Sequence, residues 1–553
     1  MSEYIKRELD NYTFEDIYNV GEEYSKNVAI NFERKKYTYQ DINKSVNYYA
    51  QLLVDKGIKA NDHVALIGMN SFNWLIAFFA IIKIGAVAVL INYMARHETI
   101  VELIKSTDCE YICYGRYIAL AKQENEFDKL LKDTGISEDK TISMSHTILN
   151  FKKIIDKNDI KPFVSPLSKE EDSKRTSFII FTTGTTAKPK AACLSQYSMM
   201  KIIYLNFAKL DPIFPQKIMC LLPMFHCFGL LVVNAFLAFK RTVYIDSLSD
   251  KFKIYKNFVR SKCGACASVG IIYDKLARAP FWWTHKARFL KYCIVGGGFT
   301  SEQEFKFLEQ KYGKGKFMNG YGQTECSPMI SLVYPGSPVS KQKKTVGVPM
   351  EGIELAFKDP ATNEYVKDGE IGEILVKGYN VFNGYYKVVK DKQPFDKDGY
   401  LHTGDLGYLD KDGYLNLTGR LKDIIIRKGE NISPREIEHE LEKFKEFDKV
   451  RVFGFPSVDE GEFIIACVEM NKKSLLFNET KYLDKLKKTL PSIRIPSHII
   501  YVNKFPLAPN GKLDEMQLRE MCLIKLAKSL GEEALVRKTR KLMNKELQKK
   551  KRK

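Results

Sequence analysis

The run SFIIFTTGTTAKPK, from Ser177 to Lys190, decides the fold. Its first half is short, apolar and rich in β-branched and aromatic residues, which is typical of a buried strand. Its second half combines small hydroxyl residues, a glycine and two lysines. At a strand end these can cradle phosphate, because backbone N–H groups and hydroxyls donate hydrogen bonds while lysines supply charge. The spacing is not that of a Walker loop, and taken alone the run could also be a flexible polar loop.

On both sides of this run, helical and strand patterns alternate. A helical pattern over residues 42–57 is followed by short apolar segments at 63–68 and 86–92, and the alternation continues through 217–223 and 291–298. Such alternation is typical of an α/β protein with parallel sheets.

Beyond residue 359 the pattern changes to short strands with Asp-Gly turns, which predict a small β-rich subdomain. From Lys422 a strand–helix–strand pattern predicts a separate small α+β domain. We therefore expect an α/β fold with a large N-terminal region of several subdomains over residues 1–421 and a C-terminal domain over residues 422–553. A chain of 553 residues has room for roughly two to four domains.

The apolar run from Trp74 to Met94 is long enough to span a bilayer. Gly85 divides it, however, into a helix-like half, WLIAFFAIIKI, and a β-branched half, AVAVLIN. We therefore predict a buried helix that leads into a buried parallel strand. The first eleven residues are mostly polar or charged, so we expect no secretory signal.

The chain is basic, with a formal net charge of +20, and residues 537–553 hold ten Lys or Arg against the single acid Glu546. Such a tail could contact anionic membrane or nucleic acid, but terminal charge runs are commonly only solvated. We expect no nucleic-acid partner and keep peripheral contact with an anionic membrane as an alternative. The eleven cysteines are scattered, and Cys263 with Cys266 has no second pair at zinc-finger spacing, so reduced thiols in a cytoplasmic protein are expected.

A second polar run, NGYGQTE, extends from Asn319 to Glu325. Its residue types suit a nucleotide. Tyr321 can stack on a base, Thr324 can donate to a phosphate, and Glu325 can bind Mg²⁺, which prefers oxygen ligands and substrate phosphates. As a lone motif the run could equally be a turn with a solvated glutamate.

Later runs add further polar residues. YLHTGDLG contains Asp405, a carboxylate that at a turn can accept both ribose hydroxyls. LTGRLKDIIIRKGENISPREIE contains Arg420, Lys422 and Gly429. Much further along, PLAPNGKLD places Lys512 in a Pro/Gly loop, where an ordinary surface lysine would also fit.

Together these runs, in this order and spacing, closely resemble the adenylate-forming superfamily of acyl-CoA synthetases, aryl-CoA ligases, luciferases and peptide-synthetase adenylation domains. The resemblance extends from about Tyr37 to Arg519. It implies an enzyme that uses ATP and Mg²⁺ to convert a carboxylic acid into an acyl-adenylate, releases pyrophosphate, and passes the acyl group to coenzyme A. The family pattern [ST]SGTTGxPKG has glycines where this chain has Ala187 and Ala191. If residue 187 needs a positive φ, alanine costs about 1–2 kcal/mol there.

The resemblance also implies roles for individual residues. The ATP phosphates would be held by Thr182, Thr183, Gly184, Thr185, Thr186 and Lys190. Adenine and ribose would be held by Asn319, Tyr321, Asp405 and Arg420. The nucleotide and acyl pockets would be lined by Gly297, Gly298 and Phe299, in VGGGFTSE. Thr324 would bind the α-phosphate and Glu325 the magnesium ion.

In such enzymes the small C-terminal domain rotates about a hinge, which matches Lys422 here. One conformation would bring Lys512 to the reacting carboxylate, and the other would bring in the Gly429 loop for thiol transfer. His226, in LPMFHCFGLLVV, matches the gate between acid and nucleotide, and the alternative is a packed histidine in an apolar run.

The apolar residues after His226, with NGYGQTECSPMI and GYNVFNGYY, look most like medium- and long-chain fatty acyl-CoA ligases and their aryl-CoA relatives. We therefore favour an aliphatic acid. An aryl-CoA (4-coumarate-like) ligase, or an acyl-AMP ligase that loads a carrier protein, remains open. A non-enzymatic alternative is a membrane-anchored or nucleic-acid-binding protein that uses the Trp74–Met94 run or the basic tail.

Overall fold

A computed structural model gives the structure of the chain at residues 9–115, 126–144, 160–182, 189–248, 251–279, 287, 289–297, 302–457, 460–471, 477–507 and 513–530. The described residues form two compact units. The first lies within 1–184, Pro189–Glu354 and Val376–Leu401, and the second within Leu355–Leu375 and 402–553. The second unit thus takes in residues ahead of Lys422. The hinge expected at Lys422 concerns movement and stays a prediction.

The Trp74–Met94 run forms a buried helix, α5 (Phe72–Lys83), that leads into a buried strand, β4 (Val87–Ile91). Every residue of both elements is buried, and the Ser71 hydroxyl caps α5 by accepting a hydrogen bond from the Trp74 N–H at 3.0 Å. Gly85 makes the turn between them with a φ of +83°. The predicted buried helix and strand are confirmed. Among the described residues, no helix is long and apolar enough to cross a membrane.

Strand β4 belongs to a six-stranded sheet in the first unit. Its order is β6 (Thr141–Ser143), β5 (Tyr111–Tyr114), β3 (His63–Ile67), β4, β7 (Phe178–Thr182) and β8 (Lys190–Leu194). All neighbours are parallel except β7 and β8, which pair antiparallel. The run that begins at Ser177 therefore enters the sheet on a buried parallel strand and returns along its edge.

A nine-stranded sheet forms the other large layer of this unit. Its order is β15 (Val348–Pro349), β14 (Ser331–Leu332), β13 (Phe317–Tyr321), β12 (Tyr292–Val295), β11 (Ala265–Ser268), β9 (Lys217–Cys220), β10 (Thr242–Ile245), β1 (Val28–Phe32) and β2 (Lys35–Thr38). The strands from β13 to β1 are parallel, and both edges are antiparallel. The expected parallel α/β layering is confirmed.

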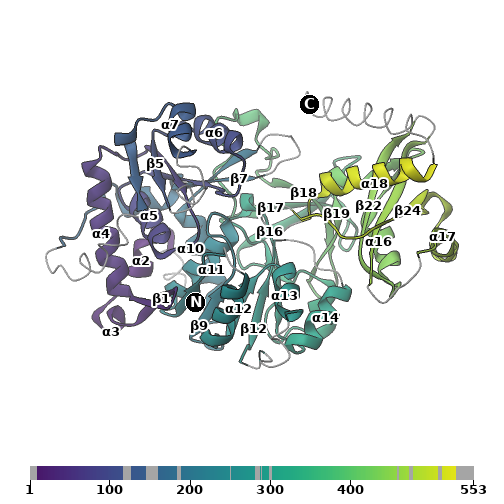
Figure 1. Cartoon of the computed structure of the whole chain (residues 1–553), viewed down its shortest axis with the longest axis horizontal. Coiled ribbons are helices and arrows are strands. Elements are labelled where there is room, and N and C mark those ends of the chain that lie inside the picture. The colour runs from purple at the N-terminus through teal and green to yellow at the C-terminus, as the bar shows by residue number, and fades with distance from the viewer. Residues whose placement is uncertain are drawn as a thin grey trace. The chain divides into compact units, whose positions relative to one another are not determined.

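Helices cover these sheets with apolar faces. In Figure 1, α12 (Lys251–Ser261), α13 (Gly270–Ala277) and α14 (Glu302–Tyr312) lie against strands of the nine-stranded sheet, and their buried side chains share one core with β11–β13. The other helices of this unit are α2 (Glu15–Tyr18), α3 (Glu22–Ser25), α4 (Tyr39–Asp55), α6 (His97–Ser106), α7 (Glu126–Thr134), α9 (Lys169–Lys174), α10 (Gln196–Asn206), α11 (Cys227–Ala238) and α15 (Val339–Lys344).

The second unit contains most of a four-stranded sheet and all of a five-stranded one. The first has the order β16 (Ile353–Lys358), β17 (Gly372–Gly378), β18 (Leu401–Leu409) and β19 (Leu415–Arg420). The second has β21 (Glu430–Ile432), β20 (Ile425–Arg427), β23 (Gly461–Met470) and β22 (Phe447–Ser457) in order, with β24 (His498–Val502) on β23. These are the β-rich part and the α+β part that the sequence predicts.

Both faces of the five-stranded sheet are covered by helices. Alternate β23 side chains point to opposite faces: Ile464 packs with α16 (Pro434–Glu442) and α17 (Glu479–Leu486), whereas Ile465 packs with α18 (Glu515–Leu530). Side chains alternate along a strand with a period of two, so β23 contributes to both cores. The buried residues of α18 pack into the second of these cores.

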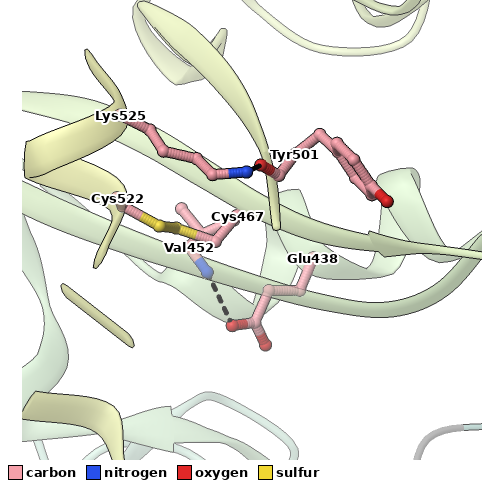
Figure 2. Close-up of a disulfide and its surroundings, with 6 residues drawn as sticks. All are labelled: Glu438, Val452, Cys467, Tyr501, Cys522 and Lys525. Atoms are coloured by element: carbon pink, nitrogen blue, oxygen red, sulfur yellow. Dashed lines mark hydrogen bonds between the residues drawn. A yellow bond between two sulfur atoms is a disulfide. The ribbon is translucent and has the colours of Figure 1, made fainter. Parts of the chain in front are cut away.

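A disulfide joins Cys467 on β23 to Cys522 on α18, with Cα atoms 6.6 Å apart (Figure 2). Beside it, the Lys525 ammonium donates a hydrogen bond to the Tyr501 carbonyl at 2.7 Å, so α18 is also attached to β24. The expectation that all cysteines are reduced thiols is wrong for this pair, because the fold brings together two residues 55 positions apart. The other nine cysteines are buried and form no disulfide.

Candidate active site

The β7–β8 hairpin holds the two ends of the predicted phosphate loop. Thr182 and Lys190 are register partners at the end of the hairpin where the loop joins the two strands. Ala191 lies within β8 opposite Phe181, so an extended backbone suits alanine there although the family pattern has glycine. Thr183, Gly184, Thr185, Thr186 and Ala187 lie outside the described residues, so their phosphate contacts stay a prediction.

The second predicted motif begins on β13 and ends in a tight turn. Tyr321 is buried, and its carbonyl accepts a hydrogen bond from the Ile330 N–H at 2.8 Å. A Cβ added at Gly322 would lie 1.8 Å from the Pro328 carbonyl oxygen, so only glycine fits this close backbone approach. The turn delivers Thr324 and Glu325 on a short 3₁₀ helix (Thr324–Cys326).

Asn319, expected at adenine, lies on the same strand as Tyr321. Its side-chain amide donates a hydrogen bond to the Thr345 carbonyl at 3.3 Å. Both residues therefore stand on one rigid strand end, which is where ligands bind in parallel α/β sheets.

Glu325 is the centre of a hydrogen-bonded group that links the two motifs. The residue is buried, with only 7% of its surface exposed. The Thr182 hydroxyl donates to its Oε1 at 3.0 Å, and the Tyr385 hydroxyl donates to the same oxygen at 2.6 Å. The structure thus brings Thr182 and Glu325 together, although they are 143 residues apart.

Tyr385 is a site residue that the sequence reasoning missed. The pKa of the Tyr385 phenol is raised, mainly by burial and next by the charge of Glu325. The hydroxyl therefore stays protonated and donates the hydrogen bond to Glu325. The Lys190 ammonium lies over its ring, 4.9 Å from the centroid. The available signal was its position in GYNVFNGYY, a run that we read only for substrate class.

The carboxylate oxygens of Glu325 are suitable ligands for Mg²⁺. Both hydrogen bonds reach Oε1, and within the described part of the chain no residue donates to Oε2. No group of three or more acidic, histidine or cysteine side chains that could hold a metal occurs among the described residues. One carboxylate completed by substrate phosphates and water is how Mg²⁺ commonly binds.

His226 is the N-cap residue of α11. Its ring is half-buried and packs against Phe225 at a centroid distance of 4.5 Å. The pKa of the adjacent Cys227 thiol is raised, mainly by burial and next by the charge of Glu325. This position suits the predicted gate, but the role itself stays a prediction.

Gly297 follows β12, is exposed, and has a φ of +76°. A Cβ added at the preceding Gly296 would lie 3.3 Å from the ring of Phe228, an α11 residue. The loop after β12 therefore lies against α11. Gly298 and Phe299 lie outside the described residues.

The remaining predicted residues belong to the second unit. Asp405 and Arg420 are register partners on β18 and β19 and form an ion pair at 3.0 Å. The aspartate is buried, whereas the arginine side chain is 58% exposed. Asp405 therefore lies in the middle of β18 and not at the turn that the sequence suggested, and Arg420 is its ion-pair partner. Binding of the ribose hydroxyls by this carboxylate stays a prediction.

Lys422 and Gly429 are exposed. Lys422 lies in a short 3₁₀ turn (Leu421–Asp423) directly after β19. Gly429, with Lys428, forms the two-residue tip of the β20–β21 hairpin, where both residues have positive φ. Lys512 lies outside the described residues, but its loop closes where Leu507 pairs with Leu513.

Residues 18–386 match the AMP-binding enzyme family. The chain belongs to this family. AMP-binding enzymes use ATP, Mg²⁺ and coenzyme A, in agreement with the cofactors expected from the sequence. The chain is therefore a ligase that activates an acid as its adenylate and joins it to a thiol.

Individual relatives agree with this AMP-binding enzyme assignment. The chain is 28% identical to the putative acyl-CoA synthetase YngI of Bacillus subtilis (88% of this chain, 92% of that protein). It is 26% identical to the mitochondrial medium-chain acyl-CoA ligase ACSF2 of Danio rerio (87% and 82%). The fold is similar to that of ATP-bound MatB from Rhodopseudomonas palustris, with a TM-score of 0.81 at 22% identity (93% and 98%).

Proposed function

We propose that this AMP-binding enzyme converts a medium- or long-chain aliphatic acid into its acyl-CoA through an acyl-adenylate. The observation that carries the proposal is Glu325, a buried carboxylate held by Thr182 and Tyr385 beside Lys190. Aryl-CoA ligation and loading of a carrier protein are the alternatives that the test below separates.

The chemistry requires charge neutralisation, because a carboxylate must attack a phosphate that is also negative. Mg²⁺, when bound, supplies a Lewis acid on the phosphate oxygens. Glu325 would hold that ion, and Lys190 would supply positive charge to the phosphates. Thr324 and Lys512 would donate to the α-phosphate and the reacting carboxylate as pyrophosphate leaves. Asn319, Tyr321, Asp405 and Arg420 would hold the nucleoside.

An aliphatic acid is favoured by the apolar surroundings of the gate. In α11 every residue except Phe228 is buried, and Phe228 is half-buried against Gly296. A half-buried aromatic ring beside the expected acyl pocket offers apolar contact to an alkyl chain. The relative named as a medium-chain acyl-CoA ligase supports the same substrate class.

Pyrophosphate release across a panel of acids tests this proposal. We expect kcat/KM to rise from butanoate to octanoate and beyond by up to about fourfold per buried methylene, since each contributes about 0.8 kcal/mol. Release of pyrophosphate over many turnovers should require coenzyme A. Preference for 4-coumarate or benzoate, or product formed only with a carrier protein, would contradict the aliphatic acyl-CoA proposal.

The basic tail, residues 537–553, is the part of the chain that we propose for contact with anionic membrane, at about 1 kcal/mol per basic residue near the surface. It lies outside the described residues. A chain that ends at Leu535 should lose binding to phosphatidylserine vesicles and keep its activity on a soluble acid. Unchanged vesicle binding would contradict the idea.

A further inference from the structure

The segment that carries Tyr385 is attached to the edge of the six-stranded sheet. Tyr385 forms an isolated antiparallel bridge with Ala192 on β8. On either side, the Tyr386 N–H donates to the Ala191 carbonyl at 2.8 Å and the Cys193 N–H donates to the Gly384 carbonyl at 2.9 Å. The backbone at Tyr385 is thus held beside the strand that begins with Lys190.

Gln393 holds the other side of the same backbone. Its Oε1 accepts a hydrogen bond from the Tyr385 N–H at 2.8 Å, and its Nε2 donates to the Tyr385 carbonyl at 3.0 Å. The same Nε2 also donates to the Val388 carbonyl at 2.8 Å. One amide side chain therefore satisfies both polar groups of Tyr385, so the residue has little freedom to move.

Three contacts fix the side chain. Phe382 packs edge-to-face on the ring at a centroid distance of 4.9 Å, with the planes at 77°. Lys190 lies over the ring at 4.9 Å, and the hydroxyl reaches Glu325 at 2.6 Å. Phe382 is itself attached to Glu325, because its N–H donates to the Glu325 carbonyl at 3.0 Å.

We propose that Tyr385 is a positioning residue that holds Glu325 for the metal ion and seats Lys190 for the ATP phosphates. The inference rests on the proposed function, in which Glu325 binds Mg²⁺. It assigns the two halves of one side chain to two tasks: the hydroxyl orients the carboxylate, and the ring face holds the ammonium.

The geometry of the carboxylate supports the first task. Thr182 and Tyr385 both donate to Oε1, which fixes the rotation of the group and directs Oε2 away from these donors. Hydrogen-bond partners of a metal-binding carboxylate commonly change metal affinity by about 10–100-fold when they are removed. Because Glu325 is buried, few water molecules can replace the lost donor.

Tyr385→Phe tests the hydroxyl alone, since the ring and its contacts with Lys190 and Phe382 remain. The measurement is binding of Mn²⁺ in the presence of α,β-methylene-ATP, read from the loss of the free-ion electron paramagnetic resonance signal. We expect a dissociation constant for Mn²⁺ at least about tenfold higher than in the wild-type chain. The analogue keeps the enzyme from turning over, so the readout is metal binding and not activity.

Tyr386→Phe is the matched control. It removes the hydroxyl of the adjacent tyrosine, which donates to Asp108 at 2.9 Å and not to Glu325. We expect this variant to bind Mn²⁺ as the wild-type chain does. Equal Mn²⁺ affinity in Tyr385→Phe, Tyr386→Phe and the wild-type chain would overturn the inference.

Tyr385→Leu tests the second task, because it also removes the ring beneath Lys190. We expect a further loss of about threefold or more in affinity for the analogue measured without metal, a loss that Tyr385→Phe does not show. Identical metal-free affinity in both variants would overturn the assignment of the ring. If the wild-type chain binds neither analogue nor Mn²⁺, the proposed function fails instead, and the inference fails with it.

Discussion

Replacing Lys512 with alanine should slow adenylation by about 10²–10³-fold, the usual effect of losing one preorganised charge at a reacting centre. The residue is far beyond the nucleotide motifs in the chain, yet the resemblance assigns it to the reacting carboxylate and α-phosphate. The prediction is that a movable part of the chain delivers Lys512 for one half-reaction and withdraws it for the other. Thioester formation from supplied acyl-AMP should therefore stay nearly normal.

Single-turnover measurement of each half-reaction separates these outcomes. Lys504→Ala is the matched control, because this exposed lysine precedes the same loop. It should leave both half-reactions unchanged. If Lys512→Ala slows both half-reactions equally, the two-conformation account is wrong and Lys512 is a structural residue.

The mirror variant is Gly429→Trp, at the exposed hairpin tip. Nothing lies within 4 Å of a Cβ added there, although a φ of +84° makes a side chain locally unfavourable by about 1–2 kcal/mol. The indole should block thiol transfer while adenylation continues. Opposite defects in Lys512→Ala and Gly429→Trp would assign each residue to its own half-reaction.

Replacing Glu325 with glutamine should lower adenylation by about 10²-fold or more at limiting Mg²⁺. The amide keeps the shape of the carboxylate and an oxygen that can accept from Thr182 and Tyr385, but it offers no negative oxygen to the ion. Thermal unfolding should therefore be close to that of the wild-type chain. Initial rates measured across a Mg²⁺ titration give the comparison.

Glu354→Gln is the control for this variant, since Glu354 also accepts a hydrogen bond from a tyrosine, Tyr400, at 3.2 Å and is not a site residue. It should not alter the Mg²⁺ dependence. Activity of Glu325→Gln within twofold of the wild type at limiting Mg²⁺ would remove Glu325 from the metal site.

Local patterns predicted the parallel sheets and the strand ends that we propose for the nucleotide. The division of Trp74–Met94 at Gly85 was sufficient to predict α5 and β4, because periodicity and a single glycine are local signals. The strand before Thr182 and the polar residues after it could be predicted from the sequence for the same reason. These features depend on neighbours in the sequence.

Contacts between segments that are distant in the chain could not be predicted from the sequence. Tyr385 reaches Glu325 only because its segment pairs with Ala192 on β8, and no local pattern encodes that pairing. The Cys467–Cys522 bond likewise depends on α18 lying on β23. Spacing alone cannot give a disulfide connectivity, and a scattered set of cysteines gave no signal.

The most direct test of the central claim follows the oxygen atoms of the acid. Octanoate labelled with oxygen-18 in its carboxylate is incubated with ATP, Mg²⁺ and coenzyme A, and the products are analysed by mass spectrometry. Attack of the carboxylate on the α-phosphate predicts one labelled oxygen in AMP, none in pyrophosphate, and octanoyl-CoA as the product. Label in inorganic phosphate together with ADP would contradict the acyl-adenylate account.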